Sequence, residues 1–92
     1  MIRARFFGYI REYVKKNWTT VEVPCGTTTN DFILELAKNF DPDLASKLMT
    51  GKSLRPEISI LVNGASIAFL RGLETELNDG DIVAILPVAG GG

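Results

Sequence analysis

The sequence predicts an α+β domain in which one main helix packs against a mixed sheet. Apolar residues alternate with other residues in segments 2–8 and 58–62, and one stretch between them repeats its apolar residues at helical spacing. The 92 residues, 46% of them hydrophobic and 23% charged, suit one small globular domain. The expected order is a hairpin, a helix and further strands, without an internal repeat.

The first predicted strand spans residues 2–8, because the side chains alternate between two faces there. A short polar stretch with helical character follows at residues 11–16. Residues 18–23 are rich in aromatic and β-branched side chains and stop at Pro24, which predicts the second strand of a hairpin. The face of the first strand that turns to the core carries Ile2, Ala4 and Phe6.

The main helix is expected to begin after Thr28, whose hydroxyl suits an N-cap, with Asp31 reaching back as in a capping box. It is expected to end at Asp41-Pro42. Residues 43–49 predict a second, short helix, and residues 51–56 a loop. The apolar stripe that should cover the sheet comprises Phe32, Ile33, Leu36, Ala37 and Phe40.

Two further strands are predicted in the second half of the chain. Residues 58–62 alternate and end at Asn63-Gly64, a pair that favours a tight turn. An irregular stretch, residues 67–77, leads to a second turn signal at residues 78–81. Residues 82–86 are apolar over the length of one strand, which predicts the last strand of the sheet.

The sequence then divides into a domain of residues 1–86 and a tail of residues 87–92. The tail reads Pro-Val-Ala-Gly-Gly-Gly, so it has almost no bulk to pack and maximal backbone freedom at its end. We expect it to project from the domain as a flexible arm. A frayed end or a cloning remnant is the alternative interpretation.

Composition argues against several kinds of function. A net charge of −1 with scattered charges speaks against nucleic acid or an anionic membrane as the main partner. No segment has the pattern of a signal peptide or of a membrane span, so we expect a cytoplasmic protein. Without histidine, and with Cys25 as the single cysteine, the sequence predicts no metal site, no catalytic triad and no internal disulfide.

One motif suggests nucleotide binding and is better explained otherwise. Gly51-Lys52-Ser53 copies the end of a phosphate-binding loop, but Ser46 stands where the first glycine of that loop would be. Pro56 also follows where a helix should run. We therefore expect any ATP to be bound by another protein.

Four features occur in a fixed order: Phe6-Phe7-Gly8 followed by Arg11-Glu12, then Val62-Asn63-Gly64, then residues 77–84, and finally Gly91-Gly92. Together they resemble the family of the small, sulfur-carrying subunit of molybdopterin synthase, over nearly the whole chain. The thiamine-pathway sulfur carrier and archaeal ubiquitin-like modifiers are similar and share the ending. The resemblance implies the ubiquitin-like β-grasp fold. The family commonly ends in Pro-Pro-Val-Ala-Gly-Gly, so this chain has one proline fewer and one glycine more.

The resemblance implies that Gly92 carries the chemistry and that Gly91 gives it a slender approach. An adenylating enzyme of the ubiquitin-activating type would use ATP and magnesium to activate the Gly92 carboxylate. Sulfur from a persulfide donor would then leave a C-terminal thiocarboxylate. In the family this sulfur passes to a pterin precursor of the molybdenum or tungsten cofactor. The chain would thus be a sulfur-carrier subunit without an active site or a bound cofactor of its own.

The expected partner is the large subunit of molybdopterin synthase. If the helix covers one face of the sheet, alternation places Phe7, Leu61 and Leu86 on the open face, with Arg11 at the border. Coverage of these residues by the chain's own loops is the alternative. The other predicted partner-binding residues belong to the tail: Pro87, Val88, Ala89 and Gly90.

Three other functions stay open at this point. The chain could couple Gly92 to lysine amines as a ubiquitin-like protein modifier, because the acyl-adenylate reacts with nitrogen as well as with sulfur. It could supply sulfur for thiamine synthesis or for transfer-RNA thiolation by the same terminal chemistry. A β-grasp binding module without chemistry at its tail is the third possibility.

Overall fold

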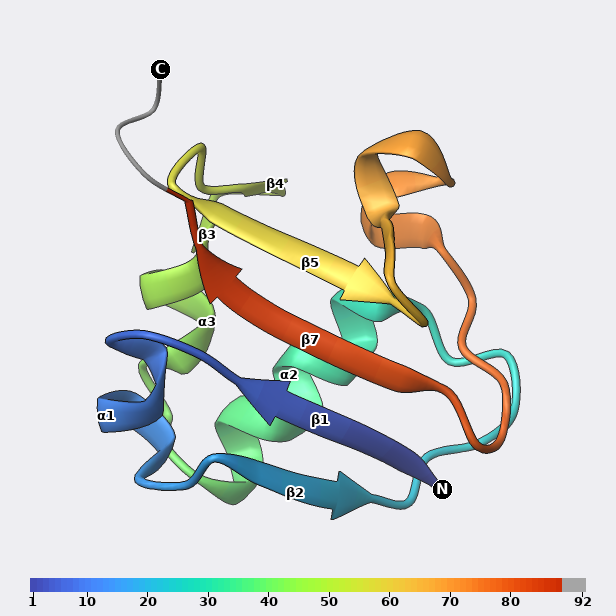
Figure 1. Cartoon of the computed structure of the whole chain (residues 1–92), viewed down its shortest axis with the longest axis horizontal. Helices are drawn as coiled ribbons and strands as arrows, with labels where there is room; N and C mark the ends of the chain where they lie inside the picture. Colours follow the sequence, from blue (N-terminus) through green and yellow to red (C-terminus); the bar gives the residue numbers. More distant parts are fainter. Residues whose placement is uncertain (89–92) are drawn as a thin grey trace.

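The computed structural model of the chain describes residues 1–88 (Figure 1). A five-stranded sheet, in the order β2-β1-β7-β5-β6, carries the long helix α2 on one face. A separate two-stranded hairpin of β3 and β4 lies beside it. The helices are α1 (Ile10–Val14), α2 (Thr29–Asn39) and α3 (Leu44–Leu48), and the strands are β1 (Ile2–Phe6), β2 (Trp18–Val21), β3 (Met49–Thr50), β4 (Ser53–Leu54), β5 (Ile58–Val62), β6 (Ala65–Ser66) and β7 (Ile82–Pro87), with 3-10 helices η1 (Ile67–Phe69) and η2 (Gly72–Glu74).

The sheet is mixed, as the sequence predicts. Strand β1 pairs antiparallel with β2 and parallel with β7, and β7 pairs antiparallel with β5. The predicted alternation of the first strand is confirmed, because Ile2, Ala4 and Phe6 are buried and the residues between them are exposed. The strand ends at Phe6 rather than at Gly8, since Gly8 adopts a φ of +58° and turns the chain into α1.

The main helix begins where the sequence predicts. The Thr28 hydroxyl accepts a hydrogen bond of 3.2 Å from the backbone N–H of Asp31. The reciprocal hydrogen bond, which the Thr28 N–H would donate to the Asp31 carboxylate, is not among the hydrogen bonds of residues 1–88. The predicted apolar stripe is confirmed: Phe32, Ile33, Leu36 and Ala37 are buried, and Phe40 packs partly buried against the core.

Two stretches predicted as loops contain short elements. Residues 51–56 include β4, which pairs with β3 across the turn Gly51-Lys52, and residues 67–77 include η1 and η2. Gly51 has a φ of +61° in this turn, so the motif that resembles a phosphate loop is a hairpin turn. Elements of two or three residues have no periodicity to detect, which explains why the pattern missed them.

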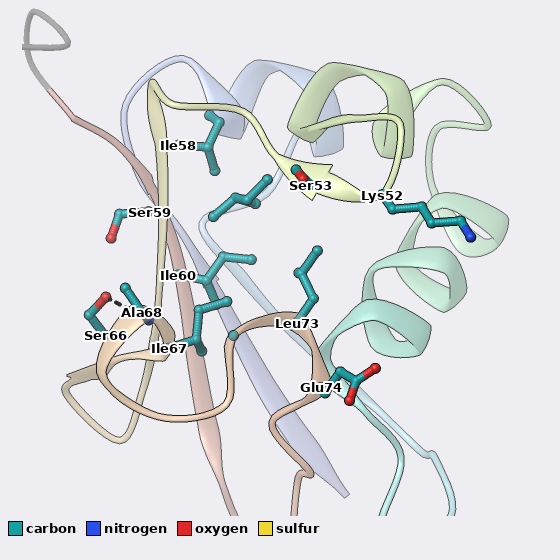
Figure 2. Close-up of a pocket in the computed structure, with 12 residues that line it drawn as sticks. Lys52, Ser53, Ile58, Ser59, Ile60, Ser66, Ile67, Ala68, Leu73 and Glu74 are labelled. Carbon is teal, nitrogen blue, oxygen red and sulfur yellow. Dashed lines mark hydrogen bonds between the residues drawn. The ribbon is translucent and has the colours of Figure 1, made fainter.

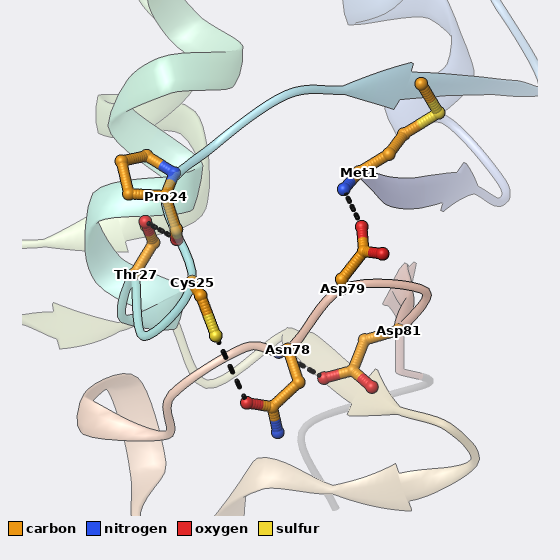
Figure 3. A network of polar contacts seen from close by, with 7 residues as sticks. All are labelled: Met1, Pro24, Cys25, Thr27, Asn78, Asp79 and Asp81. Atoms are coloured by element: carbon orange, nitrogen blue, oxygen red, sulfur yellow. Dashed lines mark hydrogen bonds and ion pairs between the residues drawn. The ribbon is translucent and has the colours of Figure 1, made fainter.

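The end of the sheet where β1 begins is closed by polar contacts (Figure 3). The Met1 amino group forms an ion pair with Asp79, and the Asp81 carboxylate accepts a 2.8 Å hydrogen bond from the Asn78 N–H. The Cys25 thiol lies 3.9 Å from the Asn78 side-chain oxygen, in a turn next to Pro24. Cys25 therefore has a structural environment in a turn, as the sequence predicts.

The core lies between the sheet and α2. Its fully buried side chains come from β1, β5, β7 and α2, with Ile10, Leu44 and Leu48 added by the short helices and Leu77 by the loop before β7. None of the helices within residues 1–88 combines the length and hydrophobicity that crossing a bilayer requires.

Candidate functional site

The tail leaves the sheet at the end of β7. Pro87 still pairs with Ile58 on β5, and the Val88 N–H donates a 2.8 Å hydrogen bond to the Glu57 carbonyl. The last strand therefore extends one residue beyond the predicted range, and the backbone is held through Val88. Four of the predicted site residues, Ala89, Gly90, Gly91 and Gly92, lie outside the described residues.

A close approach fixes the base of the tail. Gly8, in the turn between β1 and α1, packs directly against Pro87. A Cβ on Gly8 would lie 2.6 Å from Cγ and 3.0 Å from Cδ of Pro87, and the rigid proline ring cannot move aside as a flexible side chain would. Only glycine fits this position, because its φ of +58° also disfavours a side chain. Phe6-Phe7-Gly8 thus sets the place where the tail starts.

The predicted docking residues Phe7, Leu61 and Leu86 all lie on the face of the sheet away from α2. Leu61 pairs with Ala84 and Leu86 pairs with Ser59, so the two leucines are diagonal neighbours on adjacent strands. Phe7 follows β1 beside the end of β7, where its N–H donates to the Ile85 carbonyl at 3.1 Å. Phe7 is exposed and both leucines are half-buried. We call these three residues the tail-side patch, and its role in binding stays a prediction.

Arg11 borders this region from α1. Its Nε donates a 3.4 Å hydrogen bond to the carbonyl of Gly8, and the side chain is exposed. The long side chain is thereby tethered to the turn that packs on Pro87. The structure therefore brings Phe7, Arg11, Leu86 and Pro87 together at the base of the tail, while Leu61 lies farther along the sheet.

A separate pocket of about 440 Å³ opens between the β3–β4 hairpin, β5 and the two 3-10 helices (Figure 2). Apolar side chains such as Ile58, Ile60 and Leu73 line it, while its charged lining residues, Lys52 and Glu74, extend away from them. Within residues 1–88, no three histidine, cysteine, aspartate or glutamate side chains gather where they could hold a metal ion. The pocket thus offers apolar volume without an evident set of reactive groups.

Titration is perturbed at one side-chain pair. Lys47 donates a 2.6 Å hydrogen bond to the Asp41 carboxylate, and the Asp43 N–H donates to its other oxygen at 2.9 Å. These bonds lower the pKa of Asp41 below its ordinary value, and the Asp41 carboxylate raises the pKa of Lys47. Because the Lys47 bond connects α3 to the loop before it and the Asp43 bond lies within that loop, the pair is explained by local structure.

Sequence reasoning did not single out Arg3, Arg5 and Trp18. The Arg3 guanidinium lies 5.2 Å from the centre of the Trp18 ring, and the Arg5 guanidinium lies 5.6 Å from that of Phe7. Arginine at every second position of a predicted strand could have drawn attention to this face. The same alternation that places Phe7 on the open face places both arginines there as well.

Comparisons with known proteins identify relatives of this chain. The sequence profile of the ThiS family matches residues 4–92.

The chain belongs to the ThiS family.

Its relatives include the small archaeal modifier protein 3 of Haloferax volcanii, which is 32% identical over 99% of this chain and 98% of that protein. A protein of Archaeoglobus fulgidus that is named as a candidate sulfur carrier is 42% identical over 71% of this chain and 74% of that protein. The crystal structure of the BexX/CysO complex of Amycolatopsis orientalis contains a similar fold, with a TM-score of 0.86, 24% identity and full coverage of both chains.

Membership of the ThiS family and the likeness to these structures confirm the predicted ubiquitin-like β-grasp fold. They also place the chain among ubiquitin-like sulfur carriers and modifiers, which is the general class that the predicted function belongs to. The match with the ThiS family includes the glycine-rich ending as well as the folded body.

Proposed function

We propose that this protein is the sulfur-carrier subunit of a molybdopterin synthase and that it works through the carboxylate of Gly92. The observation that carries the proposal is the match with the ThiS family through residue 92, on a body whose last strand is anchored up to Val88. Four residues separate Val88 from the end of Gly92, which corresponds to a reach of about 14 Å at most. The Gly92 carboxylate would therefore lie within about 14 Å of Val88, the last residue whose backbone is held by the sheet.

The chemistry needs an activated carbonyl, because a carboxylate is a poor electrophile at neutral pH. In the adenylating partner, the Gly92 carboxylate attacks the α-phosphate of magnesium-bound ATP and releases pyrophosphate. A persulfide then attacks the acyl-adenylate, forms a C–S bond and releases AMP. A thiol next cleaves the S–S bond that came from the persulfide, which leaves the thiocarboxylate and a disulfide between that thiol and the donor. Glycine suits these steps, since no Cβ obstructs the approach to the carbonyl.

The tail-side patch would dock the large subunit of the synthase. Phe7 and Leu86 present apolar surface on the open face next to the base of the tail, and Leu61 extends this surface along the sheet, so a partner that binds there also receives the tail. The Leu86→Asp substitution places a charge in this patch. We expect it to weaken binding of the large subunit about tenfold or more, measured by calorimetry.

Phe69→Asp is the matched control for this substitution. Phe69 is 89% exposed on η1 and lies outside the patch, so the same change in chemistry should leave the affinity unaltered. An unchanged affinity of the Leu86→Asp protein would reject the docking role of the patch. Thermal unfolding of both variants checks that the fold is retained.

The proposed terminal chemistry is tested by reconstitution. The protein is incubated with the adenylating enzyme, ATP, magnesium and a persulfide donor, and intact mass is measured. We expect one oxygen to be replaced by sulfur, and fragmentation to place the change at Gly92. A protein that binds the adenylating enzyme but never forms an acyl-adenylate would contradict the proposal.

A protein modifier is the second candidate, because the relative that matches 99% of this chain is named a small archaeal modifier protein. In this case a lysine amine would attack the activated Gly92 carbonyl and form an isopeptide bond. Affinity purification from the native host separates the two functions. A sulfur carrier yields free protein with a thiocarboxylate, whereas a modifier yields covalent conjugates with Gly92 joined to lysine.

A further inference from the structure

The half of the open face on β1 and β2 has a different character from the tail-side patch. Arg3 and Arg5 alternate on β1, and their partners on β2 are Thr20 and Trp18. All four side chains lie on the face away from α2 and are exposed, with Trp18 56% exposed. We call these four residues the edge platform.

The two arginines of the edge platform are held in place but not neutralised. The Arg3 guanidinium stacks 5.2 Å from the Trp18 ring centre, and Arg5 lies 5.6 Å from that of Phe7. Within residues 1–88, neither side chain takes part in an ion pair or donates a hydrogen bond. A guanidinium that stacks on a ring keeps its N–H groups free for a carboxylate. Two preorganised cation sites therefore stand side by side on a protein whose net charge is −1.

Two of the acidic groups near this face are already engaged, whereas the exposed Glu22, directly after β2, takes part in no ion pair or side-chain hydrogen bond within residues 1–88. Asp79, which borders the groove beside Arg3 and Thr20, forms an ion pair with the Met1 amino group. The Asp81 carboxylate accepts hydrogen bonds from the Asn63 side chain and the Asn78 N–H. At the other end of β2, Lys15 adds exposed positive charge before Trp18, whereas the Lys16 ammonium lies 5.5 Å from the ring centre of Phe40 at the end of α2. Arg3 and Arg5 thus make the edge platform itself cationic, and the negative charge of Glu22 lies at its border, where it acts on the Met1 amino group.

Strand β2 also offers a free edge for backbone pairing. It is a terminal strand of the sheet, and Figure 1 shows it at one border, beside β1. The Phe6 N–H donates to the Asn17 carbonyl at 2.8 Å, so residues 17, 19 and 21 turn their backbone groups towards β1. The N–H and C=O groups of Trp18 and Thr20 therefore point outward, and no other described residue bonds to them.

We propose that this edge binds an extended acidic segment of a partner protein, which adds a strand to β2 and places its Asp or Glu side chains on Arg3 and Arg5. Backbone hydrogen bonds to Trp18 and Thr20 would give affinity, and the alternation of side chains would select carboxylates on the open face. A bidentate pair between guanidinium and carboxylate supplies the specificity. This surface is separate from the proposed terminal chemistry and does not depend on it.

The probe is a capped hexapeptide of alternating valine and glutamate, titrated into the isotope-labelled protein and followed by NMR. We expect shifts of the β2 amides and of the Trp18 indole, and binding that weakens as salt is added. The same peptide with lysine in place of glutamate should not bind. Equal binding of the two peptides would overturn the proposed selection of carboxylates.

The Arg3→Glu/Arg5→Glu double variant tests the cation sites. We expect its affinity for the acidic peptide to fall about tenfold or more, because like charges would face each other. Lys52→Glu/Arg71→Glu is the matched control: it changes the net charge equally at exposed positions away from β2 and should keep the affinity. Equal loss of binding in both variants would show a general charge effect and overturn the proposal.

The free edge of β2 is tested by one change in the protein and by one change in the peptide. Thr20→Pro removes an outward N–H, which an edge strand tolerates, and should abolish peptide binding while the protein stays folded. A peptide with N-methyl groups at alternate positions makes the same test on the unaltered protein. If the N-methylated peptide binds as well as its parent, no strand is added. Binding of a single-stranded RNA oligonucleotide at this face in place of the peptide would also overturn the proposal.

Discussion

At the scale of single residues, Gly8 determines how the tail leaves the fold. A Cβ at this position would meet the ring of Pro87 at 2.6 Å, and the backbone has a φ of +58°. Gly8→Ala therefore combines backbone strain of about 1–2 kcal/mol with a clash at the base of the tail. We expect reduced stability in urea unfolding and a slower formation of the thiocarboxylate, by up to about a hundredfold if the tail is displaced.

Gly51→Ala separates these two contributions. Gly51 has a nearly equal φ of +61°, but nothing lies within 4 Å of a Cβ built there. This variant should show the cost of backbone strain alone and keep the rate of thiocarboxylate formation. If both glycine variants lose stability and rate equally, Gly8 does not position the tail.

At the scale of elements, α2 holds the sheet through one apolar face. Leu36 is fully buried, whereas Leu34 on the same helix is 48% exposed. Leu36→Ala should cost about 2–5 kcal/mol of unfolding free energy, because it leaves a cavity between helix and sheet. Leu34→Ala should cost less than about 0.5 kcal/mol. Urea unfolding of the two variants compares the same chemical change on opposite faces, and similar losses would contradict the assigned face.

The ion pair of Asp41 and Lys47 predicts a pH dependence for α3. The pKa of Asp41 is lowered in the folded protein by the hydrogen bonds from Lys47 and from the Asp43 N–H. Its contribution to stability is therefore present above the unfolded pKa, about 4, and is lost as the pH falls through the lower folded value. Asp41→Asn should show a smaller loss of melting temperature below about pH 4 than the wild type. An identical pH profile of the two proteins would rule out this linkage.

Elements with long periodic patterns were predictable and short ones were not. Strand β1, helix α2 and strand β5 carry alternating or helical patterns over five or more residues. The sequence pattern therefore indicates which side of each element is buried. Strands β3, β4 and β6 have two residues each, and their existence depends on pairing that only the folded chain supplies. The contact of Gly8 with Pro87 joins residues far apart in sequence, so no local pattern could predict it either.

At the scale of the whole molecule, the open face of the sheet divides into two halves. The tail-side patch presents Phe7, Leu61 and Leu86 next to the end of β7, and the edge platform presents arginines along β1. Alternation predicted the first half, because apolar residues at exposed strand positions stand out in a sequence. The second half depends on which strand lies at the edge of the sheet, and strand order follows from topology rather than from any local pattern.

The folded body has, on this account, the task of presenting one carboxylate. Gly8, Pro87 and the hydrogen bond from Val88 to Glu57 fix the start of the tail, while the proposed chemistry belongs to Gly92. In the proposed function, the body would supply recognition, and the partner enzymes would supply ATP, sulfur and the acceptor.

Mass spectrometry of the protein purified from its native host tests this most directly. We predict a polypeptide that ends at Gly92, with a fraction in which one terminal oxygen is replaced by sulfur, and the loss of that fraction in a Gly92→Val variant. A native polypeptide that continues beyond Gly92 without being trimmed, or a Gly92→Val protein that still carries the sulfur, would contradict the account.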